Sequence, residues 1–269
     1  MTELVDAHVR TRTVRASRAQ PVMCPYKGLA RFERSDADLF HGRERLVAAM
    51  IARMVGTPLI AVVGASGSGK SSLVRAGLLP ALSVGALPGL ASARQVVVTP
   101  AGDPDLAAEL DPIIEAPVVL VVDQLEEVFT ALDGERRAAF VDLLVGAVTA
   151  GRATAVLTLR SDFYGHCAEH PCLASMIEEN TLLMRPMNVE ELRRAIEQPA
   201  LLAGLSMEGG LVDLLADEVR DAPGGLPLLS TALLSLWELR DGRELTLAAY
   251  RDSGGVAGAV EHVGERTPS

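Results

Sequence analysis

The sequence predicts an α/β fold, a three-layer sandwich around a mostly parallel sheet, followed by a small all-helical domain. Short apolar runs typical of buried strands alternate with helical patterns up to about residue 187, and only helical patterns follow. Such alternation implies parallel pairing, with helices covering both faces of the sheet. Apolar residues make up 49% of the 269 residues but aromatic residues only 3%, so a sizeable core can form, built mainly from aliphatic side chains.

The individual elements follow from local patterns. Strands are expected where short β-rich apolar runs end at glycine, proline or polar residues: 59–63, 95–99, 117–122, 154–159 and, more weakly, 181–184. Helices are expected where apolar residues recur at helical spacing: 43–55, 70–79, 105–110, 125–132, 135–148, 190–196, 210–220 and 227–239. Residues 24–40 look irregular, and residues 1–23 form a flexible tail. The predicted domains are therefore a core at 24–187 and a lid-like helical domain at 188–252.

A glycine-rich loop lies between the first predicted strand and the next helix. It matches the pattern G-x-x-x-x-G-K-[ST], in the order Gly64, Ala65, Ser66, Gly67, Ser68, Gly69, Lys70, Ser71. Glycines let several backbone N–H groups point inward around an anion, and the following helix adds its positive end. Lys70 can reach the β- and γ-phosphates, and the Ser71 hydroxyl can sit on Mg²⁺.

This Walker A motif predicts a P-loop NTPase core that binds ATP or ADP with Mg²⁺. The chain has only two lysines, Lys27 and Lys70, and one of them occupies the position that the motif requires. We expect residues Gly64 to Ser72 to bind the nucleotide and Lys70 to take part in catalysis as well.

Acidic residues follow the third predicted strand. Asp123 ends the run Val118–Val122, at the sheet edge where α/β proteins bind ligands, and is expected to hold Mg²⁺ with Ser71 as a Walker B residue. Glu126 and Glu127 are both candidates for the carboxylate that orients or deprotonates the attacking water. The sequence lacks the N-K-x-D signature of GTPases and the LSGGQ-like signature of transporter ATPases.

Several motifs together resemble the novel STAND NTPase domain of bacterial signalling proteins, over about residues 24–263. The segments that carry the resemblance are 24–29 (CPYKGL), 40–44 (FHGRE), the P-loop, 121–129 (VVDQLEEVF), 157–165 (LTLRSDFYG), 225–229 (GLPLL), 247–251 (LAAYR) and 254–256 (GGV). Family members usually continue into a winged helix and then sensor repeats such as WD repeats. The resemblance thus implies that residues 253–269 are a tail that begins a truncated winged-helix region.

The resemblance also implies roles for particular residues. Gly42 and Arg43 lie in the segment that resembles the part near the adenine. Arg160 matches the sensor of the γ-phosphate, where a guanidinium can clamp a transferring phosphate. Gly225 and Pro227 match the G-x-P motif, whose proline packs near the base. The implied function is a slowly hydrolysing ATPase switch, in which exchange of ADP for ATP reorients the helical domain and self-association can follow ATP binding.

Composition limits which partners and which cellular compartment are expected for this chain. The net charge of -10 and the pI of about 5.0 make nucleic acid an unfavourable partner, and the basic cluster Arg10, Arg12, Arg15 and Arg18 is interpreted as part of a solvated tail. Three cysteines cannot form a disulfide framework, and no apolar run approaches membrane-spanning length, so we expect a cytoplasmic protein without membrane contact. The crowded ligand types His166, Cys167, His170 and Cys172 lack a standard zinc spacing and are interpreted as a surface loop.

Two other functions remain open at this stage. A P-loop small-molecule kinase would need an arginine-bearing lid, and Arg193 and Arg194 could serve there. A scaffold that binds nucleotide without hydrolysing it would carry the same P-loop.

Overall fold

The computed structural model describes residues 23–102, 118–220, 222, 224–256 and 258. The tail at 1–22, the predicted helix at 105–110 and the end of the chain from residue 259 lie outside the described residues. Within the described ranges no helix is long and apolar enough to cross a membrane.

Five parallel strands form the central sheet, as predicted. They are β1 (Leu59–Gly64), β2 (Arg94–Val98), β3 (Val118–Val122), β4 (Ala153–Arg160) and β5 (Thr181–Leu183). Their spatial order is β2-β3-β4-β1-β5, so β4 lies between the strand that enters the P-loop and the strand that ends at Asp123. In register, Gly64 pairs with Arg160 and Val122 pairs with Leu157. The carboxyl ends of β1, β3 and β4 therefore meet at one edge, where α/β sheets bind ligands.

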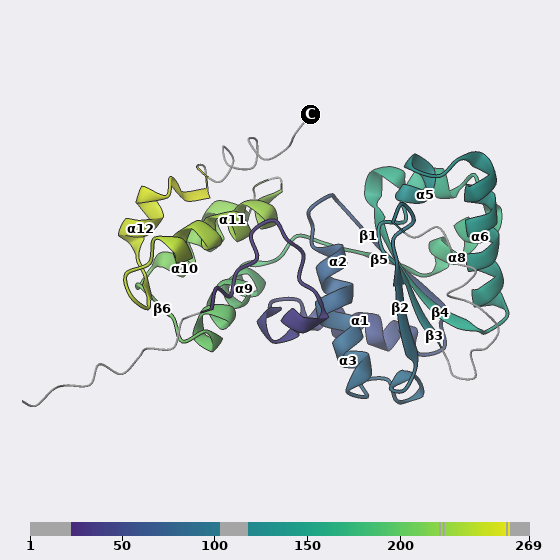
Figure 1. The fold of residues 1–269 in the computed structure, drawn as a ribbon, viewed down its shortest axis with the longest axis horizontal. Helices are drawn as coiled ribbons and strands as arrows, with labels where there is room; N and C mark the ends of the chain where they lie inside the picture. The colour runs from purple at the N-terminus through teal and green to yellow at the C-terminus, as the bar shows by residue number, and fades with distance from the viewer. Residues whose placement is uncertain (1–22, 103–117, 221, 223, 257, 259–269) are drawn as a thin grey trace, which may run out of the picture.

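Helices cover both faces of the sheet (Figure 1). Successive side chains of a strand point to opposite faces. Ile60 and Val62 pack in a cluster with α1 (Glu44–Met54) and α3 (Leu79–Ser83), whereas Ala61 and Val63 pack in a cluster with α6 (Gly134–Thr149) and α8 (Pro171–Glu179). Burial on both faces explains why β1 is a continuous apolar run.

The helix after the P-loop is continuous but not uniform. It starts as α2 (Lys70–Ser72), passes through a π-helical segment (Leu73–Leu78) and continues as α3. A π-helical segment inside an α-helix is frequent at functional sites. The predicted helix 125–132 is shorter than expected, since α5 covers only Glu127–Thr130.

The helical domain has a core of its own. It contains α9 (Val189–Leu202), α10 (Leu211–Arg220), α11 (Gly225–Glu238) and α12 (Leu247–Asp252), which share one buried apolar cluster. A two-residue parallel pair, β6 (Ser206–Met207) with β7 (Glu244–Leu245), also belongs to this domain. Runs of two residues are too short for a periodicity to reveal.

Two segments expected to be irregular contain helices. A 3₁₀ helix covers Arg34–Leu39. The expectation of a surface loop at 165–172 was wrong, because α7 (Tyr164–Cys167) and the start of α8 occupy these residues. Cys167 is buried against the sheet cluster, and burial raises the pKa of its thiol to about 11. No group of three or more His, Cys, Asp or Glu side chains in the described ranges is placed to hold a metal ion.

The chain crosses from the helical domain to the P-loop helix before the first strand. Tyr26 belongs to the buried cluster of the helical domain, and its hydroxyl donates to Ile196 O (3.0 Å). Six residues later, the Phe32 N–H donates to Ser72 Oγ (3.1 Å) on the P-loop helix. We call residues 26–33 the crossing segment; it runs between the two domains in Figure 1.

Candidate nucleotide site

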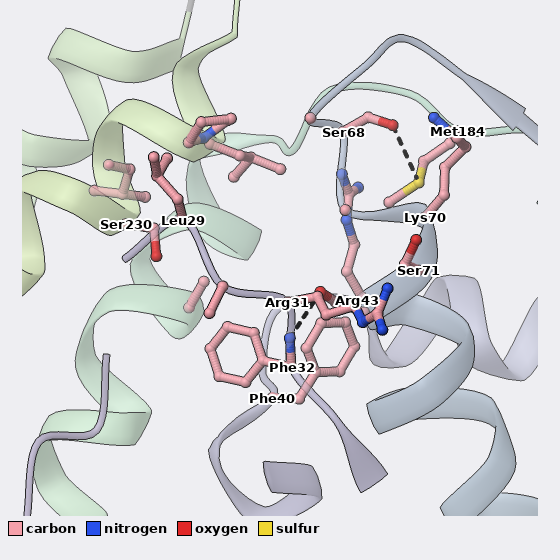
Figure 2. A pocket seen from close by; sticks show the side chains of 18 of the residues that line it. Leu29, Arg31, Phe32, Phe40, Arg43, Ser68, Lys70, Ser71, Met184 and Ser230 are labelled. Atoms are coloured by element: carbon pink, nitrogen blue, oxygen red, sulfur yellow. Dashed lines mark hydrogen bonds between the residues drawn. The ribbon is translucent and has the colours of Figure 1, made fainter. Parts of the chain in front are cut away.

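A pocket of about 380 Å³ lies between the P-loop and the helical domain. One wall is formed by residues 66–72, and the opposite wall by α11, with the crossing segment between them. In Figure 2, Leu29 and Ser230 lie on the side of the helical domain, while Ser68, Lys70 and Ser71 lie on the other side. A cleft of this size with apolar walls and a few convergent polar groups is typical of a small-molecule site.

The P-loop has the backbone that phosphate binding requires. Gly67 and Gly69 adopt φ values of +69° and +89°, which are costly for any residue with a Cβ. Lys70 Nζ donates to Gly64 O (3.0 Å) and Ala65 O (2.8 Å), so its charge lies over the loop. Burial lowers the pKa of Lys70, while the negative charge of Glu126 opposes that shift. The ammonium group is therefore within reach of an anion bound in the loop.

Ser71 and Asp123, the predicted metal residues, lie together. Ser71 Oγ donates to Asp123 Oδ1 (2.7 Å), and Thr158 Oγ1, from β4, donates to the same oxygen (2.8 Å). Asp123 is completely buried. A hydroxyl and a carboxylate are hard oxygen ligands of the kind that Mg²⁺ prefers, so the residues present fit that ion.

Gln124 has a strained backbone beside this pair. Its φ is +62°, the only positive value of a non-glycine residue within the described ranges, and its N–H donates to Thr158 Oγ1 (2.8 Å). Strain of this kind persists only where the surroundings impose it, and it clusters at functional sites. Gln124 lines the pocket, which sequence reasoning did not predict.

The structure separates the two candidate bases. Glu126 lines the pocket with 8% of its surface exposed, and its Oε2 accepts from the Arg160 N–H (3.2 Å). Glu127 is not among the residues that line the pocket in the described part of the chain. Its Oε2 accepts from the Ala101 N–H (2.9 Å), beyond the end of β2. Only Glu126 is therefore placed to reach a nucleotide in this pocket.

Arg160, the predicted sensor, lines the pocket but is paired with a neighbour. Its Nε and Nη2 donate to the two carboxylate oxygens of Asp162 (3.1 and 2.7 Å), and its guanidinium lies 5.3 Å from the centre of the Phe163 ring. The hydrogen bonds to Asp162 raise the pKa of Arg160. Because this pair is exposed, Arg160 can turn from Asp162 toward a γ-phosphate at little cost.

Arg43 is a buried cation with unpaired donors. Only 3% of it is exposed, it lines the pocket, and neither Nε nor Nη2 has a hydrogen-bond partner. Its Nη1 lies 3.7 Å from Glu191 Oε2 of α9, and burial lowers the pKa of Arg43. Because buried polar groups normally find partners, these donors are free for a ligand. Gly42 before it cannot carry a side chain, since a Cβ there would lie 2.3 Å from Glu191 O.

Pro227 brings the helical domain into contact with the P-loop. A Cβ on Gly67 would lie 2.8 Å from Pro227 Cγ, so the two residues are in van der Waals contact. Gly225, at the start of α11, packs so closely on α10 that a Cβ there would lie 2.4 Å from Val219 O. The two residues of the G-x-P motif thus have different tasks, one in helix packing and one at the pocket.

The arginines considered for a kinase lid lie elsewhere. Arg193 pairs with Asp213 of α10, and Arg194 pairs with Glu44 of α1 (3.0 Å). Both side chains are roughly half exposed, and neither lines the pocket in the described part of the chain.

Sequence reasoning missed residues that surround Asp123. Arg75 Nε donates to Asp123 Oδ2 (2.9 Å), and Thr158 Oγ1 donates to the other carboxylate oxygen. Arg75 follows Ser71 by four residues, so helical spacing alone could have indicated that both face the same side. Thr158, the single hydroxyl near the end of an apolar strand, was a second available signal.

Comparisons with known proteins identify the family and the fold. A family model described as Novel STAND NTPase 1 matches residues 25–268. No curated protein is similar enough to match.

Solved structures match the fold across most of the chain. Domain III of the replication initiation protein DnaA from Thermotoga maritima has a TM-score of 0.54 at 12% identity, covering 83% of this chain and 92% of that one. ORC2 from Aeropyrum pernix, in ADPNP–ADP complexes, has a TM-score of 0.57 at 16% identity, covering 84% and 68%. A RuvB variant from Thermotoga maritima has a TM-score of 0.54 at 17% identity, covering 88% and 73%.

Proposed function

The chain belongs to the novel STAND NTPase 1 family, and on that premise we propose that it is an ATP-binding switch that hydrolyses ATP slowly and reorients its helical domain when ATP replaces ADP. One observation carries the proposal: the pocket has one wall on each domain, with Pro227 of α11 packed on Gly67 of the P-loop. A ligand in this pocket contacts both domains, so a change of ligand can change how they pack.

The P-loop holds the phosphates in this proposal. Lys70 exchanges its two carbonyl acceptors for phosphate oxygens, and the N–H groups of the loop donate to the same anion. Arg43, which lines the same pocket, supplies its unpaired Nε and Nη2 to the nucleotide. The apolar side chains of Leu29, Leu226 and Pro227 enclose the base.

Mg²⁺, when bound, neutralises phosphate charge and orients the phosphates, and Ser71 with Asp123 would hold it. Glu126 acts on the attacking water. Its Oε2 is held by the Arg160 N–H, which leaves Oε1 to accept the proton.

Hydrolysis by a single chain is slow in this proposal because the arginine that a second molecule would supply is not in place. Arg160 is paired with Asp162, but this pair is exposed and can rearrange toward a transferring phosphoryl group at little cost. An arginine from a second molecule is typically worth about 10³ to 10⁵ in rate, so self-association on ATP binding would accelerate turnover. We place the protein in the cytoplasm, which supplies ATP. The three free cysteines are compatible with the reducing environment of that compartment.

The distance between the two domains tests the switch. A spin label on the exposed Cys172 of α8 reports on the core, and one on Leu201→Cys at the exposed end of α9 reports on the helical domain. Cys24 is replaced by Ser in this background. We expect the distance distribution from pulsed electron spin resonance to differ between ADP and a non-hydrolysable ATP analogue.

The matched control for this measurement is Lys70→Ala, which should show one distribution with either nucleotide. If the labelled protein that retains Lys70 gives the same distance distribution with ADP and with the ATP analogue, the switch is refuted. Nucleotide binding without any phosphate release, even in a single turnover, would instead favour a scaffold.

A further inference from the structure

Two arginines lie close to the carboxylate of Asp123, which is proposed to hold Mg²⁺, and they offset its negative charge. Arg75 Nε donates to Asp123 Oδ2 at 2.9 Å, and Arg31 Nη1 lies 4.0 Å from the same oxygen. The side chain of Asp123 is 1% exposed and that of Arg75 is 14% exposed, whereas that of Arg31 is 45% exposed. Arg75 is therefore the partner that water screens least.

Arg75 is held at both ends. Its Nη1 donates to Glu33 Oε2 (3.2 Å) in the crossing segment while its Nε stays on Asp123. Glu33 also accepts from Arg31 Nε (2.6 Å). The two arginines and the two carboxylates balance one another in charge without any metal ion. A guanidinium with two carboxylate partners in fixed directions does not move aside freely.

This arrangement opposes a divalent cation. Asp123 Oδ1 already accepts from Ser71 and Thr158, and Oδ2 accepts from Arg75. A cation that approaches Asp123 meets a positive group on the same carboxylate, and like charges at such short range repel strongly in a buried site.

We propose that Arg75 is a positioning residue that sets how weakly the nucleotide site takes Mg²⁺: it occupies Asp123 Oδ2 in competition with the cation. Glu33 moderates this competition, because its carboxylate shares the charge of Arg75. The inference rests on the proposed nucleotide binding and adds a control of metal affinity, exerted from the crossing segment that also contacts the helical domain.

A purely structural role for Arg75 makes a different prediction. If the residue only fastens the helix after the P-loop to the crossing segment, its replacement lowers the melting temperature but leaves metal affinity unchanged. The readout must therefore be the metal itself.

The experiment titrates Mn²⁺ into the full chain with saturating ADP and follows free Mn²⁺ by its electron spin resonance signal. We expect Arg75→Gln to bind Mn²⁺ about tenfold more tightly than the original chain, because one unit of positive charge is removed beside the site. Arg75→Lys retains the charge and should stay within about threefold of the original chain. Arg34→Gln removes an exposed arginine that bonds Gln95 and Ser83, and it should change nothing.

Glu33→Gln keeps the test decisive if Arg75→Gln fails to fold. Glu33 is 43% exposed in its side chain, and its loss leaves Arg75 and Arg31 with Asp123 alone, so Mn²⁺ should bind about threefold more weakly. Unchanged or weaker metal binding in Arg75→Gln, or unchanged or tighter binding in Glu33→Gln, overturns the inference. ADP binding to the original chain, measured in EDTA with a fluorescent analogue, separates this failure from that of the proposed function. If ADP itself does not bind, both proposals fall.

Discussion

Replacing each glutamate after Asp123 by glutamine tests the assignment of the base most directly. The two residues are adjacent in sequence, yet Glu126 lines the pocket and Glu127 caps the Ala101 N–H outside it. Glutamine has nearly the same shape and can still accept both hydrogen bonds, so each variant removes a charge and little else.

The expected magnitudes differ by at least an order of magnitude. A positioned general base contributes about 10² to 10⁴ in rate, so Glu126→Gln should lower the rate of hydrolysis by at least about 10². Glu127→Gln should change that rate by less than about threefold and lower the free energy of unfolding by at most about 1 kcal/mol. ATP affinity should hold or increase in Glu126→Gln, since a negative charge beside the phosphates is lost.

The assay is a single turnover with protein in excess over γ-labelled ATP, with release of labelled phosphate followed over time. Excess protein isolates the chemical step from product release. Glu127→Gln serves as the matched control for Glu126→Gln. The reasoning is refuted if Glu127→Gln slows the step as much as Glu126→Gln does, or if neither variant slows it.

Three further outcomes follow from the structure. Gly67→Ala and Gly56→Ala should each lower stability by about 1 kcal/mol in thermal melts, because both glycines have φ near +70° to +80°. Only Gly67 faces α11, so only its variant should also lose ADP affinity, by about tenfold or more. Equal losses of ADP affinity in the two variants would contradict the contact with α11. Lys70→Ala should weaken ATP binding by about 10², measured by titration of a fluorescent analogue, since a charge-assisted hydrogen bond contributes about 1.5–3 kcal/mol; an unchanged affinity would remove Lys70 from the site. Burial, with the neighbouring Glu218 carboxylate, raises the pKa of Tyr250, so its contribution to stability is complete below the ordinary pKa of 10.0 and is lost as the pH rises further. Tyr250→Phe should make the loss of melting temperature above pH 10 smaller, and an identical pH profile would contradict this linkage.

Local sequence patterns sufficed to predict those parts of the site whose functional residues are close neighbours along the chain. The P-loop, its flanking strand and helix, and Asp123 at the end of a buried run are all set by residues within a few positions of one another. The strands β1, β3 and most of β4 are buried on both faces and are therefore continuous apolar runs, which made them predictable, whereas β2 and β5 at the sheet edges are only partly buried. The helices at 164–179 were missed because polar and sulfur-containing residues dominate their start, while the apolar positions that pack on the sheet are few.

By itself, the sequence determined the fold class, the phosphate-binding loop and the strand that carries Asp123. The tertiary structure decided the strand order, which inserts β4 between β1 and β3 and so brings Thr158 and Arg160 to the site. It also decided which glutamate faces the pocket, and it placed Arg75 on Asp123 with Glu33 behind it. These contacts join residues 34 to 52 positions apart, and no local periodicity encodes them, because they exist only once separate elements pack on one another.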